Sequence, residues 1–252
     1  MEASERVIAP RSMQPPPLWR DRQQAGEALA EVLQAWRGAP SAVVIGLPRG
    51  GVVVAAAVAE ALQLPLASWA VRKLAHPQAP ELAVGAIAPG GVLLWEEPYL
   101  HQLHLDPPLR RELVATQDRE LHRRQRLYGD PAAASLQGHT LLVVDDGIAT
   151  GLTLRAALQS LRQTRPARLV LAVPVLDQRL LERLTPLVDQ LVALAAVPSI
   201  QAVGTWYEHF EPVPDAQVLA LLATGRSEPL ERGGAGGVGA VFGSGALELE
   251  HD

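Results

Sequence analysis

The sequence predicts an α/β fold in which a parallel β-sheet is covered by helices on both faces. Short apolar runs of strand length alternate with segments of helix length, and the connections between them are short, as in sheets of this type. Hydrophobic residues make up 48% of the 252 residues and aromatic residues only 4%, so Ala, Val and Leu must supply the core. This composition suits parallel strands that are buried on both faces.

The first half of the chain predicts two buried strands, two helices and a hairpin. Apolar residues recur at helical spacing after Asp21, whereas the run that precedes Gly50 and Gly51 is almost continuously apolar. Prolines and polar residues favour a loop after the second strand, and Pro89-Gly90-Gly91 favours a turn. In order, we expect a helix at 21–38, a strand at Ala42–Leu47, a helix at Val52–Gln63, a strand at Pro65–Val71, a loop at Arg72–Leu82 and a hairpin of Ala83–Ala88 with Val92–Trp95.

The second half continues this alternation. Asp106 is a typical N-cap because two prolines follow it, and the helix that it begins extends to about Tyr128. Beyond it we expect strands at Leu141–Asp145, Arg168–Val173 and Asp189–Leu194, and helices at Leu152–Arg162, Asp177–Leu184 and Asp215–Leu222. Ligands on parallel sheets bind beyond the carboxyl ends of the strands, so the loops after Leu47, Val71 and Asp145 are the candidate binding loops.

The two ends of the chain differ in composition from its middle. Residues 1–17 end in three consecutive prolines, and glycine is frequent from Gly225 onward. We therefore expect a disordered leader at 1–17, one domain at 18–224 and a disordered tail at 225–252.

Charge and composition argue against several classes of protein. The net charge of −5 does not indicate a nucleic-acid or membrane partner, and the absence of cysteine excludes disulfides and thiolate chemistry. The apolar run Val52–Leu62 is too short to cross a bilayer and contains Glu60. The arginines of the helix Arg110–Tyr128 alternate with acids, which favours a solvated face over a nucleic-acid surface. We expect a cytoplasmic protein, and a homodimer stays open.

The segment Leu141–Thr153 has a pattern suited to a sugar phosphate. An apolar strand ends in Asp145 and Asp146, and a loop with two glycines and two threonines then enters a helix. Backbone N–H groups at a helix start bind anions, and glycines allow a ligand to approach closely. Adjacent carboxylates can accept hydrogen bonds from a vicinal diol and can approach a hard cation. Each half of the segment alone is more often a turn or a helix cap, but the two together predict a ribose 5-phosphate site.

This segment resembles the phosphoribosyl-diphosphate signature of type I phosphoribosyltransferases. Segments at Gly46–Gly51, Arg72–Ala86 and Ala202–Phe210 are also similar to a bacterial subgroup of that family, and the resemblance covers about 19–222. It implies that family's parallel-sheet fold, with a small hairpin and flexible-loop insertion and a C-terminal hood. It also implies that Asp145 and Asp146 hold the ribose hydroxyls, with Mg2+ near them directly or through water. The implied 5-phosphate loop consists of Gly147, Ile148, Ala149, Thr150, Gly151, Leu152 and Thr153.

Two further loops fit the same ligand. Arg49, Gly50 and Gly51 follow the first strand and match the family's diphosphate loop, where backbone amides and a guanidinium fork can meet phosphate oxygens. Arg72 and Lys73 lie where the family has a flexible catalytic loop, and they could neutralise the leaving diphosphate. Lys73 is the one lysine of the chain, although a surface lysine is an equally good interpretation.

The aromatic residues Trp206 and Tyr207 match the position of the family's hood, where one of them could stack on an acceptor base. Packing at the edge of the domain is an equally good interpretation of both side chains.

The resemblance implies an enzyme that transfers the phosphoribosyl group of phosphoribosyl diphosphate to a nitrogen acceptor, with a nucleobase as the expected acceptor. Two alternatives remain open at this point. The chain could sense phosphoribosyl diphosphate as a regulatory or RNA-binding protein without transfer, or it could hydrolyse the ligand with water as the acceptor.

Overall fold

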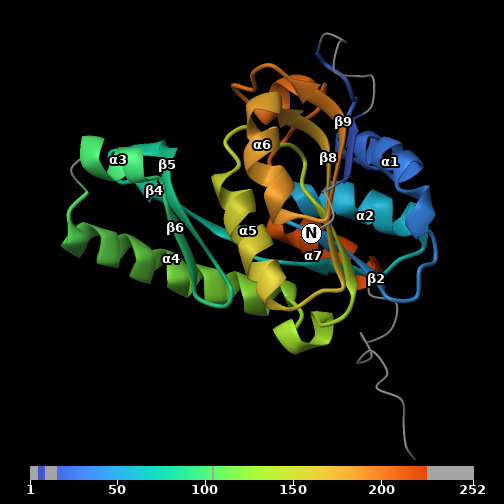
Figure 1. Cartoon of the computed structure of the whole chain (residues 1–252), viewed down its shortest axis with the longest axis horizontal. Coiled ribbons are helices and arrows are strands. Elements are labelled where there is room, and N and C mark those ends of the chain that lie inside the picture. The colour runs from blue at the N-terminus through green and yellow to red at the C-terminus, as the bar shows by residue number, and fades with distance from the viewer. Residues whose placement is uncertain (1–4, 9–15, 104, 226–252) are drawn as a thin grey trace, which may run out of the picture.

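The centre of the protein is a six-stranded parallel sheet. A computed structural model describes residues 5–8, 16–103 and 105–225, and it arranges the strands in the order β1-β9-β8-β7-β2-β3 (Figure 1). The strands are β1 (Glu5–Ile8), β2 (Ala42–Gly46), β3 (Leu66–Ser68), β7 (Thr140–Val144), β8 (Arg168–Asp177) and β9 (Gln190–Val197). The predicted α/β class with a parallel sheet is confirmed.

Helices cover both faces of this sheet. On one face lie α1 (Arg22–Val32), α2 (Gly50–Leu62) and α7 (Asp215–Gly225), and on the other lie α5 (Leu152–Gln163) and α6 (Leu181–Leu184). Short 3-10 turns connect them at Gln34–Trp36, Ala133–Leu136, Gln178–Leu180, Thr185–Leu187 and Val203–Trp206. Successive strand residues point to opposite faces, so Val44 packs with α1 and α2 while Val43 and Ile45 pack toward α5. Two cores therefore sandwich the sheet and hold the ends of its strands rigidly.

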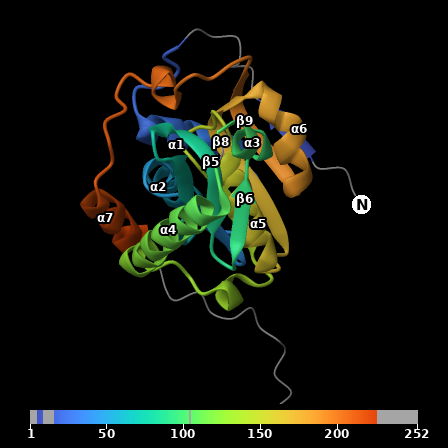
Figure 2. The same cartoon turned by 90° about the vertical axis from the view of Figure 1, so that its left-hand side faces the viewer.

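A second, antiparallel sheet forms a lobe beside the main body. It consists of β4 (Arg72–His76), β5 (Ala79–Ala88) and β6 (Val92–Trp95), and it carries α3 (Glu97–Gln102) and α4 (Pro107–Tyr128). Figure 2 looks onto this lobe, with α4 crossing in front of the body. A small apolar cluster that includes Leu74, Ile87 and Leu121 holds the lobe together. We call β4, β5, β6, α3 and α4 the lobe below.

The predicted loop at Arg72–Leu82 is wrong, because most of this segment belongs to β4 and β5. Only Pro77 and Gln78 form the turn between the two strands. The polar residues that suggested a loop are partly exposed positions of a hairpin whose Leu74 is fully buried. Two irregularities in register, on either side of Ala75, accommodate the prolines of this hairpin.

Three other boundaries differ from the sequence prediction. Residues 5–8 are not an unstructured leader, because they pair with β9 as an edge strand; residues 1–4 and 9–15 lie outside the described residues. The strand predicted at Pro65–Val71 shrinks to three residues. β8 continues four residues beyond its predicted end at Val173, to Asp177, and the helix predicted at Asp177–Leu184 begins one residue later as a 3-10 turn that leads into α6. Gly225 ends α7, and the predicted tail at 226–252 lies outside the described residues.

None of the helices among the described residues has both the length and the apolar character needed to cross a bilayer.

Candidate active site

The two adjacent acids lie at the carboxyl end of β7, in the middle of the sheet. β7 pairs with β2 on one side and β8 on the other, so the loops after three buried strands meet here. Asp145 and Asp146 are both partly buried. This is the edge at which a parallel sheet presents its ligand site, as the sequence predicts.

Asp146 is held by contacts from distant parts of the chain. Arg22 Nε donates to Asp146 Oδ2 at 2.8 Å, and the two side chains are only 10% and 16% exposed. The Arg22 guanidinium lies over the ring of Phe210, 3.6 Å from its centroid. The hydroxyl of Tyr207 donates to the backbone carbonyl of Asp146. The acid therefore has a defined orientation before any ligand arrives.

Asp145 is in a different electrostatic situation. Its Oδ1 accepts a hydrogen bond from the backbone N–H of Asp146 at 2.9 Å. Burial, and then the negative charge of Asp146, raises the pKa of Asp145 well above its usual value. Burial also raises the pKa of Asp146, but Arg22 opposes that shift. A carboxyl whose ionised form is this disfavoured is well suited to interact with a cation or with hydroxyl donors.

The loop at the start of α2 packs directly on the acid pair. A Cβ atom at Gly50 would overlap Asp146 Oδ2, and one at Gly51 would lie 2.7 Å from Asp145 Oδ1. Only glycine leaves room for this approach. The peptide bond that precedes Arg49 in this loop is cis. The Arg49–Gly51 loop and the two acids thus form one continuous surface.

The loop after Asp146 runs from the sheet to the first turn of α5. Ile148 exchanges backbone hydrogen bonds with Val175 and Asp177 of β8, both of 3.0 Å, which ties the start of the loop to the sheet. Gly151 has φ of +74° and precedes α5 without a capping side chain. The first N–H groups of α5 therefore lack a side-chain cap, and Thr150 is exposed beside them. This geometry suits an anion at the helix start.

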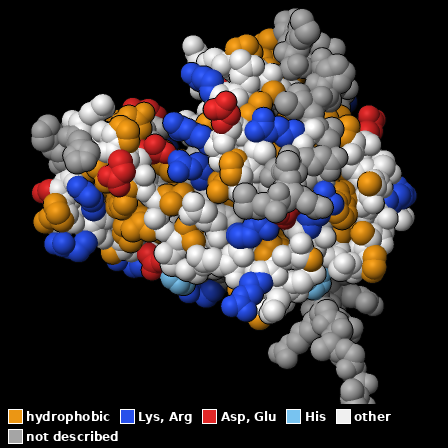
Figure 3. All heavy atoms as spheres, viewed as in Figure 1, with side chains coloured by type: hydrophobic (Ala, Val, Ile, Leu, Met, Phe, Trp, Pro, Cys, Tyr) orange, Lys and Arg blue, Asp and Glu red, His pale blue; other side chains and the backbone are white. Residues whose placement is uncertain are grey.

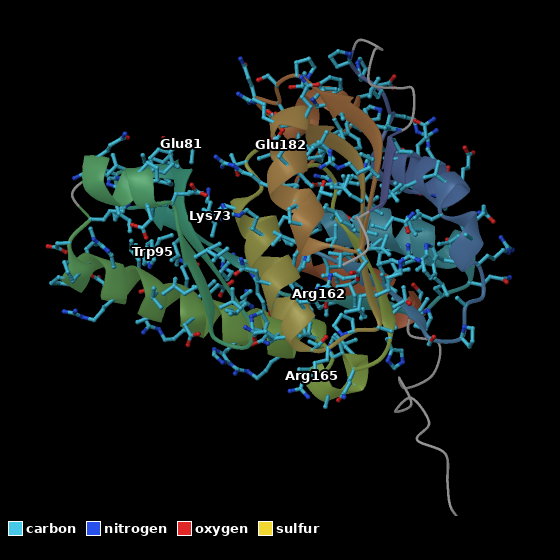
Figure 4. The ribbon with its side chains drawn as sticks, in the orientation of Figure 1. Lys73, Glu81, Trp95, Arg162, Arg165 and Glu182 are labelled. Carbon is cyan, nitrogen blue, oxygen red and sulfur yellow. The ribbon has the colours of Figure 1, made fainter. Side chains whose placement is uncertain are left out.

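Arg72 and Lys73 lie on β4 of the lobe, not on an irregular loop. Arg72 donates to Gln117 Oε1 of α4 from both Nε and Nη2, at 3.0 and 2.8 Å, and burial lowers its pKa. Lys73 Nζ donates to the carbonyl oxygens of Pro80 and Glu81 on β5, at 2.8 and 3.4 Å. Figure 4 shows Lys73 and Glu81 on the side of the lobe that faces the body, with Glu182 of α6 across from them.

A cavity of about 320 Å³ separates the lobe from the loop that enters α5. It is lined by Glu81, Leu82, Ala83, Glu96, Pro98, Tyr99, Gln102, Thr150, Leu152 and Arg183. Figure 3 shows a hollow between the lobe and the body, with Lys and Arg side chains along it. Larger hollows, of about 600 and 450 Å³, lie beside α2 and α7, but no lysine or arginine lines them. Of these three hollows, the one beside the lobe alone has a cationic lining residue, Arg183, and it also contains Glu81 and Glu96.

A family comparison agrees with this geometry. The model of the family described as "Phosphoribosyl transferase domain" matches residues 22–186, which is more than half of the chain. The chain belongs to the phosphoribosyl transferase domain family. The matched residues include α2, the whole lobe, the acid pair and α5.

Individual relatives support this assignment. Two Mycobacterium tuberculosis proteins, from strains CDC 1551 / Oshkosh and ATCC 25618 / H37Rv, each carry the name "Putative phosphoribosyl transferase" and are 39% identical to this chain over 217 residues. The match covers 86% of this chain and 49% of each relative, so the chain spans about half the length of these curated relatives. The crystal structure of TT1426 from Thermus thermophilus is 38% identical and covers 83% of this chain and 99% of its own, with a TM-score of 0.65.

Tyr207, which lies beyond the residues matched by the family model, has a packing role. Its side chain is 5% exposed, and its ring centroid lies 5.7 Å from that of Trp19 and 5.0 Å from that of Phe210. Its ring is thus enclosed by its neighbours instead of facing a ligand. Trp206 is partly buried, and its carbonyl oxygen accepts hydrogen bonds from Leu18 and Trp19.

The segment that contains Trp206 also covers Gly147. A Cβ atom at Gly147 would lie 2.5 Å from Val203 Cγ1, so Val203 packs tightly on the residue that follows the two acids. The predicted C-terminal hood therefore packs closely on the residue that follows the acid pair.

Two charged residues near the Arg49 loop, Asp215 and Arg123, were not among the site residues predicted from the sequence. Arg49 lies 3.6 Å from Asp215 at the start of α7, and Asp215 also accepts a hydrogen bond from the Tyr128 hydroxyl at 2.7 Å. Burial and this bond raise the pKa of Tyr128 to about 12. Arg123 of α4 approaches the same carboxylate at 3.9 Å. The end of the arginine-rich helix therefore lies near the Arg49 loop, which no local sequence pattern indicates.

Proposed function

We propose that the protein transfers the 5-phosphoribosyl group of phosphoribosyl diphosphate to a nitrogen acceptor, with a nucleobase as the acceptor and diphosphate as the leaving group. The observation that carries this proposal is the acid pair packed between two glycine-containing loops, each of which enters a helix. Acids beside two potential anion sites match a ligand with a phosphate at one end, a diphosphate at the other and a diol between them.

In this proposal each loop holds one end of the ligand. Residues 147–153 and the first turn of α5 bind the 5-phosphate, and Arg49, Gly50 and Gly51 bind the diphosphate. Asp145 and Asp146 hold the ribose hydroxyls and stabilise the positive charge that develops at the anomeric carbon. Binding energy at the two ends then positions the reacting carbon, which raises the rate of transfer.

The leaving diphosphate needs positive charge. We assign this role to Arg72 and Lys73 on the lobe, together with Arg49 on the body. Closure of the lobe toward the body would also exclude water, which otherwise competes as the acceptor. For the acceptor side we retain Trp206, because the ring of Tyr207 is enclosed by its neighbours.

Mg2+ is the expected cofactor of this reaction, bound with the substrate. Among the described residues, no group of three or more His, Asp or Glu side chains is arranged to hold a metal ion. The donors that fit are the carboxylates of Asp145 and Asp146, of which Asp146 already shares one oxygen with Arg22. The ion would neutralise diphosphate charge, with the substrate supplying most of its oxygen ligands.

The arginines of α4 bear on the alternative of an RNA-binding sensor. Arg123 and Arg124 both pair with Glu120, and Arg123 also approaches Asp215. Charges that are already neutralised within the protein are poor contacts for a nucleic-acid backbone. The ion pairs of these two arginines favour transfer over an RNA-binding role, and the cytoplasm remains the location that we expect.

The proposal is tested by thermal unfolding with ligand. Phosphoribosyl diphosphate with MgCl2 should raise the melting temperature, since a ligand at ~100 times its dissociation constant adds about 2.7 kcal/mol to stability. Asp145→Asn should lose most of this shift, whereas Asp118→Asn, on the exposed side of α4, should keep it. Equal shifts in the two variants, or none in the wild type at saturating ligand, would contradict the proposal.

Transfer is then measured as diphosphate release with a panel of nucleobases. Release that depends on one base identifies the acceptor, and release without any base identifies hydrolysis.

A further inference from the structure

Arg22 joins Asp146 to a part of the chain that the proposed reaction does not otherwise use. It is the first residue of α1, and its Nε donates to Asp146 Oδ2 at 2.8 Å. Its Nη1 donates to the carbonyl oxygen of Glu211 at 3.1 Å, and its guanidinium lies 3.6 Å from the centroid of the Phe210 ring. With only 10% of its side chain exposed, Arg22 is held from three sides.

The backbone of Asp146 is fixed by the same neighbourhood. The Tyr207 hydroxyl donates to its carbonyl oxygen, and Tyr207 forms a parallel bridge with Trp19 just before α1. Backbone N–H groups of Glu208 and His209 donate to the carbonyl oxygens of Trp19 and Arg20, at 3.0 and 2.8 Å. The segments that precede α1 and α7 are therefore hydrogen-bonded to each other, and Tyr207 links them to the backbone of Asp146.

Asp145 lacks a comparable partner. Within the part of the chain that the structure describes, no cationic side chain lies within 4 Å of its carboxylate, and Oδ1 accepts only the N–H of Asp146. One acid of the pair is thus neutralised internally, and the other is not.

We infer that Arg22 is a positioning residue that gives the two acids different tasks in binding a ribose 5-phosphate group. Arg22 anchors Asp146 through Oδ2, so that Asp146 meets the ribose hydroxyls in a fixed position, whereas Asp145, without a cationic partner, can adjust to them. This inference rests on the proposed function and deepens it.

The physical reason is the repulsion between adjacent carboxylates. Two buried negative charges side by side would turn away from each other or take up protons. A guanidinium supplies the opposite charge through directed N–H bonds, and the Phe210 ring fixes its plane. Gly50 packs against both Arg22 and Asp146, and its lack of a side chain leaves room for this ion pair.

The test compares two ligands that differ by the ribose. The affinities of the full chain for ribose 5-phosphate and for inorganic phosphate are measured by calorimetry with MgCl2, and their ratio reports the ribose subsite. Arg22→Gln should lower this ratio about 10-fold, the lower end of the scale for removing a residue that orients a metal ligand. Affinity for inorganic phosphate should stay within about twofold, because its subsite lies in a different loop.

Two further variants serve as controls, one for the charge of Arg22 and one for replacing an arginine in the same segment. Arg22→Lys should restore part of the ratio, because it keeps the charge without the planar fork. Arg20→Gln makes the same change two positions earlier, at a side chain that is 60% exposed, and should leave the ratio unchanged. In an Asp146→Asn background, Arg22→Gln should add little if Arg22 acts through Asp146.

Protein that fails to fold is recognised by its melting curve. If Arg22→Gln does not fold, Phe210→Leu replaces it, since that variant keeps both charges but removes the ring that orients Arg22. It should shift the ratio in the same direction by roughly threefold.

The outcomes separate the two ideas. A wild-type ratio in folded Arg22→Gln, or in Phe210→Leu where it takes that place, overturns the inference and leaves the proposed function standing. Full additivity in the double variant does the same. If the wild-type protein does not bind ribose 5-phosphate more tightly than inorganic phosphate, both the proposed function and the inference are contradicted.

Discussion

Asp146 and Lys73 both belong to the candidate site, but the protein holds them in different ways. Asp146 lies at the end of a central strand, and its carboxylate and carbonyl oxygens are bound by Arg22 and Tyr207. Lys73 lies on the lobe, and among the described residues its Nζ donates only to carbonyl oxygens of the neighbouring strand. The proposed ribose end of the site is thus held in a fixed geometry, whereas the proposed leaving-group end includes a lysine that can be redirected.

Burial explains this difference. The body is packed on both faces of its sheet, so the end of β7 has few alternative arrangements. The lobe has a small apolar cluster of its own, and Ala86, Ala88 and Val92 of β5 and β6 also pack into the apolar cluster on the α5 face of the body. The end of the β4–β5 hairpin near Lys73 differs, because residues 75–82 are all partly or fully exposed. A segment with few buried contacts can change its position at low cost, which suits a lid.

The largest effect that we expect is a loss of turnover when the proposed leaving-group end of the site is changed. In Lys73→Ala, turnover should fall by roughly 10²–10³, the scale for losing one charge contact that forms in the transition state. Stability without ligand should change by less than about 0.5 kcal/mol, as for most surface substitutions. Steady-state kinetics and denaturant unfolding measure the two effects.

Arginine is the control at this position. Lys73→Arg should recover only part of the turnover, because a planar fork cannot replace a compact ammonium. Wild-type turnover in Lys73→Ala would mean that Lys73 is an ordinary surface lysine, and Arg72 or Arg49 would become the better candidate.

The next prediction addresses the ribose end. In Gly50→Ala the new Cβ atom would overlap the Asp146 carboxylate, so the acid or the loop must move. A displacement of about 1 Å at a catalytic centre can cost about 10²-fold in rate, and we expect a loss of that size.

Gly85→Ala is the matched substitution in the lobe. Its Cβ atom would lie 2.7 Å from the Leu94 carbonyl oxygen and 2.8 Å from the Trp95 ring. Overpacking there should lower stability by about 1–3 kcal/mol while affinity for inorganic phosphate is retained. A loss of phosphate affinity in folded Gly85→Ala would show that the body and the lobe are not separable as described.

The smallest effect concerns the charges of α4. The hydrogen bonds from Arg123 and Arg124 lower the pKa of Glu120 to about 2 from a usual value of 4.5. A lowered pKa in the folded state means that the pair stabilises the protein above pH 4.5 and loses this effect as the pH falls toward 2. Because Glu120 is 28% exposed, Glu120→Gln should cost no more than about 1 kcal/mol at pH 7.

Unfolding between pH 7 and pH 2 measures this effect. The difference between wild type and Glu120→Gln should shrink as the pH falls. Glu112→Gln, on the same helix but without an ion pair to any described residue, should show no such trend. A difference that persists at the lowest pH would show that Glu120 contributes through packing and not through charge.

Local patterns were sufficient for the elements of the body. The apolar runs at Ala42–Leu47 and Leu141–Asp145 predicted β2 and β7 to within a residue, and Asp106 caps α4 as its two following prolines indicate. These predictions succeed because strand burial and helix capping depend on residues that are close in sequence. The prediction failed at Arg72–Leu82, because pairing between β4 and β5 outweighed the local preference of proline and polar residues for a loop.

The amino-acid sequence by itself determined the α/β class and the pairing of two acids with a glycine-containing loop before a helix. Both follow from short-range patterns of apolar, acidic and glycine residues. Only the tertiary structure decided that Arg22 pairs with Asp146, that the Tyr207 ring packs inward and that Arg49 lies near Asp215. Arg22 and Asp146 are 124 positions apart, and a charge beside a helix N-cap looks like any surface arginine until the sheet brings the two together. The physical reason is that burial and ion pairing depend on the positions of distant segments, which no local pattern encodes.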